Sequence, residues 1–443
     1  MDAGVARWLV SHEAVRHIVR AGGFDDPSSL ATGTALRREL DPQRAAAVLD
    51  LVDLRRRGGT KLGDLAGRLF LTHDGLQEAT RWQVARWRAE RIAAYQPNLV
   101  VDLGCGLGID ALACQNAGMP VTAVERDPVT AIFAAANLTS TVAGTSRTAS
   151  TDTHGDGSFV SHVLGELGET KEPSLCLRQW DEPGVRTVAP ATVITADVTA
   201  LDLGPWLADR RTVIFLDPAR RTARGRSWNP DDLSPSWDFV WSVIDQARGP
   251  VVVKLGPGFP HHLLPEGCDA TWVSQHGDLV ETTLWSGPGV TGQRQAVILG
   301  RDGDSRSVIP AGARPPAAGP LATYLYEPDP GVIRAQAVGT LAHQLGAWPV
   351  APGIAYLTGP ALLGTPFATA FEIESSLDFS VRNLRGWARD HQIGSIEIKV
   401  RGLDVDPAVL RRDLHLQGKH SATVVLTLTT EGTKALVVRR IRL

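Results

Sequence analysis

The sequence is poor in cysteine. Only four of its 443 residues are cysteines, and none stands in a CxxC pair or at a zinc-binding spacing with histidine. This scarcity excludes a disulfide framework and predicts no metal site. Long apolar runs are also missing, since none approaches the roughly 20 residues that a membrane-spanning helix needs. The N-terminus is broken by charges and is no secretory signal, so a cytoplasmic protein is expected.

A strong overall charge is absent as well. The formal net charge is -3 and the isoelectric point is near 6.5, so no overall field draws the chain to nucleic acid. The charge is unevenly spread, however. Residues 381–443 contain 12 Lys+Arg and 6 Asp+Glu, a local charge of +6, which leaves -9 on residues 1–380. The C-terminal region is therefore the candidate for contact with an anionic partner.

Periodicity divides the chain into parts. Residues 1–95 carry apolar residues at helical spacing, as in RAAAVLDLVDLRRR and LQEATRWQVARWRAERIAAY, and predict a helical N-terminal domain. Residues 96–301 alternate short buried strands with helices, which predicts a mostly parallel sheet covered on both faces. A segment rich in Ser, Thr and Gly at about 139–190 interrupts this domain and predicts a flexible insertion.

The rest of the chain predicts a hairpin, a linker and a smaller domain. DATWVSQHGDLVETTLWSG reads as two strands joined at His276-Gly277-Asp278. Residues 302–320 predict a linker, and 321–375 a connecting α/β segment whose helix begins at Asp329-Pro330. Residues 376–443 predict a small α+β domain with a helix at about 407–416 and strands at SIEIKVRG, SATVVLTLTT and KALVVRRIRL.

A glycine-rich turn, VDLGCGLGID at residues 101–110, directly follows the first predicted strand. A phosphate-binding Walker loop needs a lysine after its last glycine, and the dinucleotide motif has the spacing GxGxxG; this turn has neither. The carboxylate of Asp102 would repel a pyrophosphate but suits a cation. S-adenosylmethionine carries a positive ammonium and a positive sulfonium, and glycines let the backbone approach such a ligand closely.

The ends of the next two strands supply further acidic residues. Glu125 ends the second strand, where a carboxylate can accept hydrogen bonds from ribose hydroxyls, and Asp197 ends the third, within reach of an adenine amino group. This pattern resembles class I S-adenosylmethionine-dependent methyltransferases over roughly residues 97–300. The resemblance implies a Rossmann-like sheet of seven mostly parallel strands with a reversed final hairpin. The implied cofactor-binding residues are Asp102, Gly104, Gly106, Gly108, Glu125 and Asp197.

The fourth strand ends in FLDPARRTARGRSW, which the resemblance places beside the methyl group. Enzymes that methylate exocyclic base nitrogens carry [DN]PP[YFW] there, whereas here Ala219 replaces the second proline and Arg220 replaces the aromatic residue. We predict Asp217, Pro218, Arg220 and Lys254 as catalytic residues. Lys254 is included because it interrupts the apolar fifth strand at its carboxyl end, where a salt bridge is an equally good interpretation.

The sequence DPAR also resembles the DPxR form of RNA uracil-C5 methyltransferases, whose chemistry requires a cysteine nucleophile. Cys105 and Cys114 lie in the glycine turn and the helix after it, which leaves Cys268 as the one thiol in a conceivable position. Its surroundings, PEGCDA, offer no adjacent base. We therefore interpret Cys268 as an ordinary loop residue.

The order of the parts resembles bacterial class I methyltransferases with a THUMP-like C-terminal domain, over nearly the whole chain. The segments that carry this resemblance are LFLTHDGLQEATRWQVARWRAERIA, the DPARR loop, YLYEPDPGVIRA and IEIKVRGLDVDPAVLRRDLHLQGKHSATVVLTL. THUMP modules present tRNA or rRNA to a methyltransferase. The resemblance and the local charge together predict RNA contacts from Arg221, Arg224, Lys399, Arg401, Arg411, Arg412 and Lys419.

Three functions are consistent with these features. The favoured one is a methyltransferase that modifies a base in structured tRNA or rRNA. The second is a methyltransferase acting on a small molecule or a protein side chain. The third keeps cofactor binding without turnover, as an RNA-binding or assembly factor whose DPAR motif has lost the acceptor site. The sequence leaves open which RNA, base and atom would be modified, and also the oligomeric state.

Overall fold

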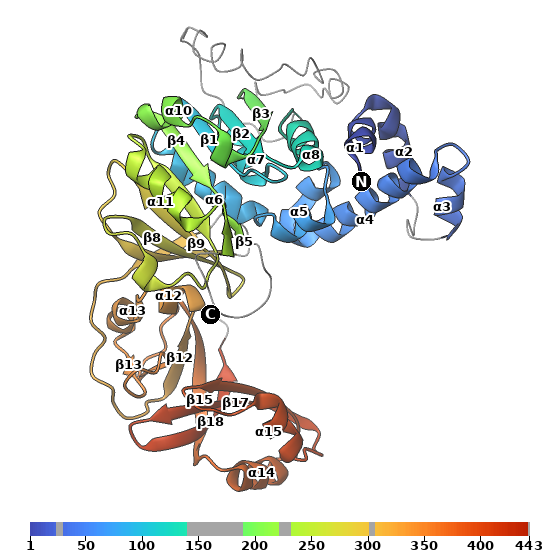
Figure 1. Cartoon of the computed structure of the whole chain (residues 1–443). Helices are drawn as coiled ribbons and strands as arrows, with labels where there is room; N and C mark the ends of the chain where they lie inside the picture. The colour runs from blue at the N-terminus through green and yellow to red at the C-terminus, as the bar shows by residue number, and fades with distance from the viewer. Residues whose placement is uncertain (24–29, 140–188, 221–231, 301–305, 442–443) are drawn as a thin grey trace. The chain divides into compact units, whose positions relative to one another are not determined.

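The computed structural model describes residues 1–23, 30–139, 189–220, 232–300 and 306–441. They fold as two compact units, Met1–Val253 and Lys254–Leu443 (Figure 1). The predicted insertion at about 139–190 lies almost wholly outside the described residues. In the parts of the chain that are described, no helix is long and apolar enough to cross a membrane.

The first unit begins with helices, as the apolar periodicity predicts. The predicted helix over LQEATRWQVARWRAERIAAY is interrupted, because Ala79 is extended and Thr80 turns its hydroxyl to Asp110. The helices are α1 (Ala3–Leu9), α2 (His12–Gly22), α3 (Leu30–Leu36), α4 (Pro42–Leu62), α5 (His73–Glu78) and α6 (Trp82–Ala93).

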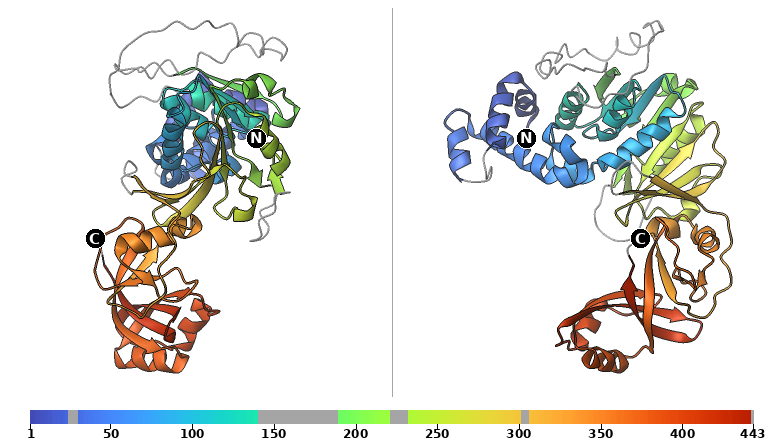
Figure 2. Two further views of the ribbon diagram at one scale, coloured as in Figure 1. Left: turned by 90° about the vertical axis from the view of Figure 1, so that its left-hand side faces the viewer. Right: turned by 180° about the vertical axis from the view of Figure 1, so that it is seen from behind.

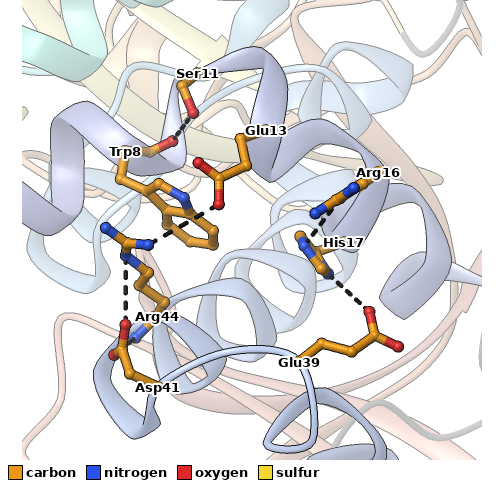
Figure 3. Close-up of polar contacts among 8 residues, drawn as sticks. All are labelled: Trp8, Ser11, Glu13, Arg16, His17, Glu39, Asp41 and Arg44. Carbon is orange, nitrogen blue, oxygen red and sulfur yellow. Dashed lines mark hydrogen bonds and ion pairs between the residues drawn. The ribbon is translucent and has the colours of Figure 1, made fainter.

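Polar contacts join the first helices (Figure 3). Arg44 of α4 lies over the ring of Trp8 of α1, 4.9 Å from its centroid, with its Nε 3.4 Å from the carboxylate of Asp41. The buried side chain of His17 in α2 places Nδ1 3.6 Å from Oε2 of Glu39. Asp41 also caps α4, since its carboxylate accepts hydrogen bonds from the first turn. The Arg44 contact thus joins α1 to α4, and the His17 contact joins α2 to the segment just before α4.

Five strands of the first unit are parallel, in the order β7-β4-β1-β2-β3. The side chains of β1, β4 and β7 are mainly Val, Ile, Leu and Phe, as expected for strands buried on both faces. The strands are β1 (Leu99–Leu103), β2 (Val121–Glu125), β3 (Ala191–Thr195), β4 (Thr212–Leu216) and β7 (Val251–Leu255).

The helices between these strands follow the predicted alternation. They are α7 (Ile109–Asn116), α8 (Pro128–Thr139), α10 (Gly204–Ala208) and α11 (Trp237–Gln246), and a short ladder pairs β5 (Ala219–Arg220) with β6 (Leu233–Ser234). The N-terminal helices reach this layer, because α6 packs on α7 and α1 packs on α8 (Figures 1 and 2). The first unit is thus a parallel sheet with an attached helical region.

The second unit starts with the predicted hairpin. β8 (Asp269–Gln275) and β9 (Asp278–Ser286) are antiparallel, and the turn between them places His276 and Gly277 at positive φ. With two more strands, β10 (Arg294–Leu299) and β11 (Arg306–Pro310), the sheet that contains β1 has nine strands among the described residues, whereas the resemblance implies seven. β11 lies inside the predicted linker 302–320, where it pairs with β10 and buries Ile309.

A second sheet follows, in the order β13-β14-β12-β15-β18-β17-β16. The helix predicted to begin at Asp329-Pro330 does begin there, with Asp329 as its cap and Pro330 as its first residue. Gln336, however, has a left-handed backbone and divides this helix into two, α12 and α13. The predicted boundary at 375/376 falls within β15. The elements are β12 (Tyr324–Pro328), α12 (Pro330–Arg334), α13 (Val338–Leu345), β13 (Trp348–Pro349), β14 (Leu357–Gly359), β15 (Ala368–Asp378), α14 (Val381–Asp390), β16 (Ile393–Arg401), α15 (Pro407–Asp413), β17 (His420–Thr429) and β18 (Gly432–Arg440).

The alternation of strands β17 and β18 creates two cores, one on each face of this sheet. Val424 and Val437 pack with α14 and α15, whereas Val425 and Leu436 pack with Tyr356 and Phe371 on the opposite face. The predicted strands and the helix at 407–416 are present, but α14 was not predicted.

Candidate active site

The predicted site residues of the first unit meet at one edge of the parallel sheet. In the strand register, Leu103 of β1 is the partner of Val124 in β2 and of Leu216 in β4. The residues that come next are Gly104, Glu125 and Asp217, so all three strands end at the same level. Such an edge is where open α/β sheets bind their ligands.

The glycine turn has a left-handed backbone at three positions. Gly104, Gly106 and Gly108 have φ values of 97°, 54° and 76°, which side-chain-bearing residues rarely adopt. The amides of Gly104 and Cys105 both donate to the carbonyl of Val124 at 2.9 Å. A Cβ on Gly104 or Gly106 would meet no atom of the described chain within 4 Å, so this side of the turn is open to a ligand.

Two carboxylates make the turn electronegative. Asp102, on β1, is only 1% exposed, and Glu125 ends β2. Burial raises the pKa of the Cys105 thiol well above its ordinary value, and the negative charges of Asp102 and Glu125 raise it further. A turn with this field disfavours a pyrophosphate and favours a cationic ligand.

Glu125 supports the turn as well as facing the site. Its Oε2 accepts a hydrogen bond from the amide of Gly106 at 3.0 Å, and its Oε1 accepts one from the amide of Asp127 at 2.8 Å. Each carboxylate oxygen has a second lone pair. The same side chain therefore has acceptor capacity for two ribose hydroxyls, as the sequence predicts.

Asp197 has a local partner that the sequence analysis did not identify. Its Oδ1 accepts hydrogen bonds from the amide of Thr199 at 2.9 Å and from the Thr199 hydroxyl at 2.7 Å, which caps the short turn at Val198–Ala200. These bonds lower the pKa of the exposed carboxyl group. Contact with an adenine amino group stays a prediction for this residue.

S-adenosylmethionine fits the residues at this edge. Gly104 and Gly106 have open space where a Cβ would be, and the negative charges of Asp102 and Glu125 act on the turn. Binding of the ammonium and the ribose by these two carboxylates stays a prediction. Asp102 is the register partner of Ala123, two residues before Glu125 on the adjacent strand. The predicted cofactor set therefore gathers at one place, with Asp197 after the next strand.

Three of the predicted catalytic residues follow β4, and the fourth, Lys254, is the penultimate residue of β7. Asp217 is half-buried and Pro218 is buried, directly after Leu216. Lys254 is half-buried in β7 and follows Val253, which is the register partner of Leu216. Arg220 ends the short strand β5. Arg221 and Arg224 lie outside the described residues.

The three thiols among the described residues do not resemble nucleophiles. Burial raises the pKa of Cys105, Cys114 and Cys268, so all three stay protonated near neutral pH. For Cys268, a side-chain hydrogen bond with Ser286 partly opposes the rise in pKa. This agrees with the interpretation of Cys268 as an ordinary loop residue.

Replacing Asp102 by alanine is expected to weaken S-adenosylmethionine binding by about 100-fold, because a buried charge-assisted interaction with the ligand is lost. Isothermal titration calorimetry measures this. Asp209→Ala is the control, since Asp209 holds Arg211 and Thr212 at the opposite end of β4. Equal affinity in the Asp102 variant and the wild type would remove Asp102 from the cofactor site.

The predicted basic residues of the second unit do not form one surface. Lys399 of β16 donates to Oε2 of Glu327 at 2.8 Å, and both side chains are about one-fifth exposed, at 21% and 19%. Arg401 lies over the ring of Tyr356, 5.0 Å from its centroid. These two residues thus stabilise the face of the sheet opposite to α14 and α15.

The other predicted basic residues lie on or beside α15. Arg411 and Arg412 are exposed on the helix, and Lys419 is exposed just before β17. The preceding helix α14 adds exposed arginines at positions 382, 385 and 389, which the sequence analysis did not single out. Their spacing of three and four residues was the available signal, since it places them on one helix face.

Comparisons with known proteins agree with this arrangement. Residues 368–440 match the family described as THUMP domain-like, and residues 2–58 match a domain of unknown function. An uncharacterized S-adenosylmethionine-dependent methyltransferase of Mycobacterium tuberculosis, found in two strains, is 30% identical over 400 residues. These cover 87% of this chain and 93% of the relative.

A solved structure has the same fold over most of the chain. It is that of a protein from Porphyromonas gingivalis W83 provisionally assigned as a methyltransferase. The two chains are 18% identical, with a TM-score of 0.68, and the similarity covers 95% of this chain and 100% of the other. This likeness shows a shared fold.

Proposed function

Because the chain belongs to the S-adenosylmethionine-dependent methyltransferases, we propose that it methylates a base in structured RNA, either tRNA or rRNA. The observation that carries the proposal is the combination of the electronegative glycine turn with a THUMP-like second domain that exposes two arginine-bearing helices. The first feature serves methyl transfer in general, and the second favours an anionic macromolecule.

The chemistry is assigned to the carboxyl end of β4. When bound, the cofactor supplies an electrophilic methyl carbon for in-line displacement. Asp217 follows Leu216, the register partner of Leu103, so its backbone position is level with Gly104, the first residue of the glycine turn. In the proposal it accepts a hydrogen bond from the acceptor nitrogen, and the backbone around Pro218 holds the base. Most of the rate enhancement then comes from positioning.

The RNA surface is assigned to α14 and α15. Arg385 of α14 donates from Nε at 3.0 Å to the carbonyl of Asp413 and so joins the two helices. Arg382, Arg411 and Arg412 are exposed beside it. Arginine forks suit phosphate oxygens, and such contacts position a nucleic acid without reading its sequence. Lys399 and Arg401 are left out of this surface because they have partners on the opposite face.

Comparison of RNA nucleosides by mass spectrometry tests the function. Cells without the gene are expected to lack one methylated nucleoside, which the wild-type gene restores. An unchanged RNA profile would favour one of two alternatives, a small-molecule or protein acceptor, or a cofactor-binding factor without turnover. Methyl transfer from labelled cofactor into a protein or metabolite fraction separates these two.

Binding of bulk tRNA tests the surface. The affinity is expected to fall steeply with salt concentration, and replacing Arg382, Arg411 and Arg412 by glutamine is expected to reduce the slope by about one unit for each lost phosphate contact. Arg57→Gln is the matched control, because Arg57 is an exposed helical arginine of the first unit paired with Asp53. A triple variant with the wild-type slope would contradict the assignment.

A further inference from the structure

One buried amide connects the N-terminal region to the glycine turn. Asn137 of α8 is 0% exposed. Its Oδ1 accepts a hydrogen bond from the amide of Phe70 at 2.8 Å, and its Nδ2 donates to the carbonyl of Phe70 at 3.1 Å and to the carbonyl of Leu107 at 3.0 Å. Leu107 lies between the second and third glycines of the turn. A single side chain thus holds the backbone of two segments that are 37 residues apart in sequence.

Close packing also holds Leu107 and Gly108, on the side of the turn that faces α5 and α8. Gly75 of α5 lies so near Leu107 that a Cβ on the glycine would be 2.6 Å from Leu107 Cδ1. On the inner side, a Cβ on Gly108 would meet Ala134 at 3.5 Å. Leu107 is itself buried. The turn is therefore enclosed between α5 and α8 on the side away from the ligand.

A third connection holds the helix that follows the turn. The hydroxyl of Thr80 donates to Oδ2 of Asp110 at 2.6 Å, and Arg88 of α6 forms an ion pair with Oδ1 of the same carboxylate. Asp110 lies in the first turn of α7. The residues from Leu107 to Asp110 are thus anchored to the segment from Phe70 to Arg88 through backbone, packing and charge.

We propose that Asn137 is a positioning residue for the cofactor. By fixing the Leu107 carbonyl it holds the open face of Gly104–Gly106 in the binding geometry, and the segment from Phe70 to Arg88 becomes a structural part of the cofactor site. The left-handed glycines make this support necessary, because glycine is the residue with the most backbone freedom to lose when a turn is ordered. The proposal concerns cofactor affinity and so does not depend on the identity of the acceptor.

Calorimetry with S-adenosylmethionine and S-adenosylhomocysteine tests it, at a temperature well below the unfolding midpoint of each variant. Asn137→Ala is expected to weaken both ligands about tenfold or more. Asn137→Asp has the same size and keeps the acceptor for Phe70, but it places oxygen opposite two carbonyl oxygens, so a similar loss is expected. Val48→Ala empties a buried position of α4 and should leave both affinities within about twofold of wild type.

Two results would overturn the proposal. One is wild-type affinity in a folded Asn137 variant, and the other is an equal loss in Val48→Ala, which would make the effect one of general stability. If both Asn137 variants fail to fold, amide hydrogen exchange of the wild-type protein, with and without cofactor, tests the proposal instead. Coupling is reciprocal, so saturating S-adenosylmethionine should protect the amide of Phe70 more than that of Ile18 in α2. Equal protection of these two amides would rule the proposal out.

Discussion

Replacing Arg88 by methionine is expected to lower the free energy of unfolding of the first unit by about 3–5 kcal/mol. Arg88 is 1% exposed and its partner Asp110 is 13% exposed. The guanidinium also lies over the ring of Phe215 in β4, 5.2 Å from its centroid. Methionine retains much of the side-chain volume but leaves the Asp110 carboxylate without its cation. Urea denaturation followed by circular dichroism measures the change.

The matched control for Arg88 is Arg57→Met. Arg57 forms an exposed pair with Asp53 within α4, at 3.5 Å, and its loss should cost less than about 1 kcal/mol. Combining Arg88→Met with Asp110→Asn should recover part of the stability, because the neutral amide removes the uncompensated charge. Equal effects of the two arginine substitutions would mean that burial of the Arg88 pair contributes nothing to stability.

The parallel sheet could be predicted from the sequence because its signals are local. Runs such as LVVDLG and VVVKLG are apolar except for one charged residue near the carboxyl end, Asp102 and Lys254, and each is bounded by a turn or a helix. The prediction of Asp102 and Glu125 as site residues has the same local basis, since both lie at strand ends beside the glycines. Carboxyl ends of parallel strands share one edge, and this topology alone brings the two residues together.

Asn137 could not be predicted in this way. Its partners are backbone groups of Phe70 and Leu107, which are 67 and 30 residues away. No pattern in the sequence of α8 distinguishes a buried asparagine with such partners from an exposed one. Only the packing of α5 and α8 around the turn creates the contact.

For Lys399 and Arg401, in contrast, the local sequence pattern already indicates on which face of the sheet they lie. In the strand IEIKVR, Ile396 and Ile398 pack with the helices, so Lys399 and Arg401 must point to the other face. Strand alternation therefore separates them from Arg411 and Arg412 on α15. A count of positive charge along the C-terminal region cannot detect this separation.

Replacing Asp217 by alanine is expected to reduce methyl transfer by about 10²–10³-fold, with little change in cofactor affinity. The rate is expected to fall without the affinity because of where Asp217 lies. It follows β4, whereas the cofactor's ammonium and ribose are assigned to residues at β1 and β2. Transfer of label from S-adenosylmethionine into RNA from cells lacking the gene measures the rate, and calorimetry measures the affinity. Asp217→Asn retains an oxygen acceptor and should keep part of the activity.

Asp202→Ala is the control for Asp217, since Asp202 is an exposed carboxylate that accepts a hydrogen bond from the amide of Gly204 at 2.9 Å. It should leave both the rate and the affinity unchanged. Full activity in Asp217→Ala would move the acceptor away from the end of β4 and would weaken the assignment of base methylation. Loss of cofactor affinity in that variant would instead make Asp217 part of the cofactor site, so the two measurements together decide which role its carboxylate has.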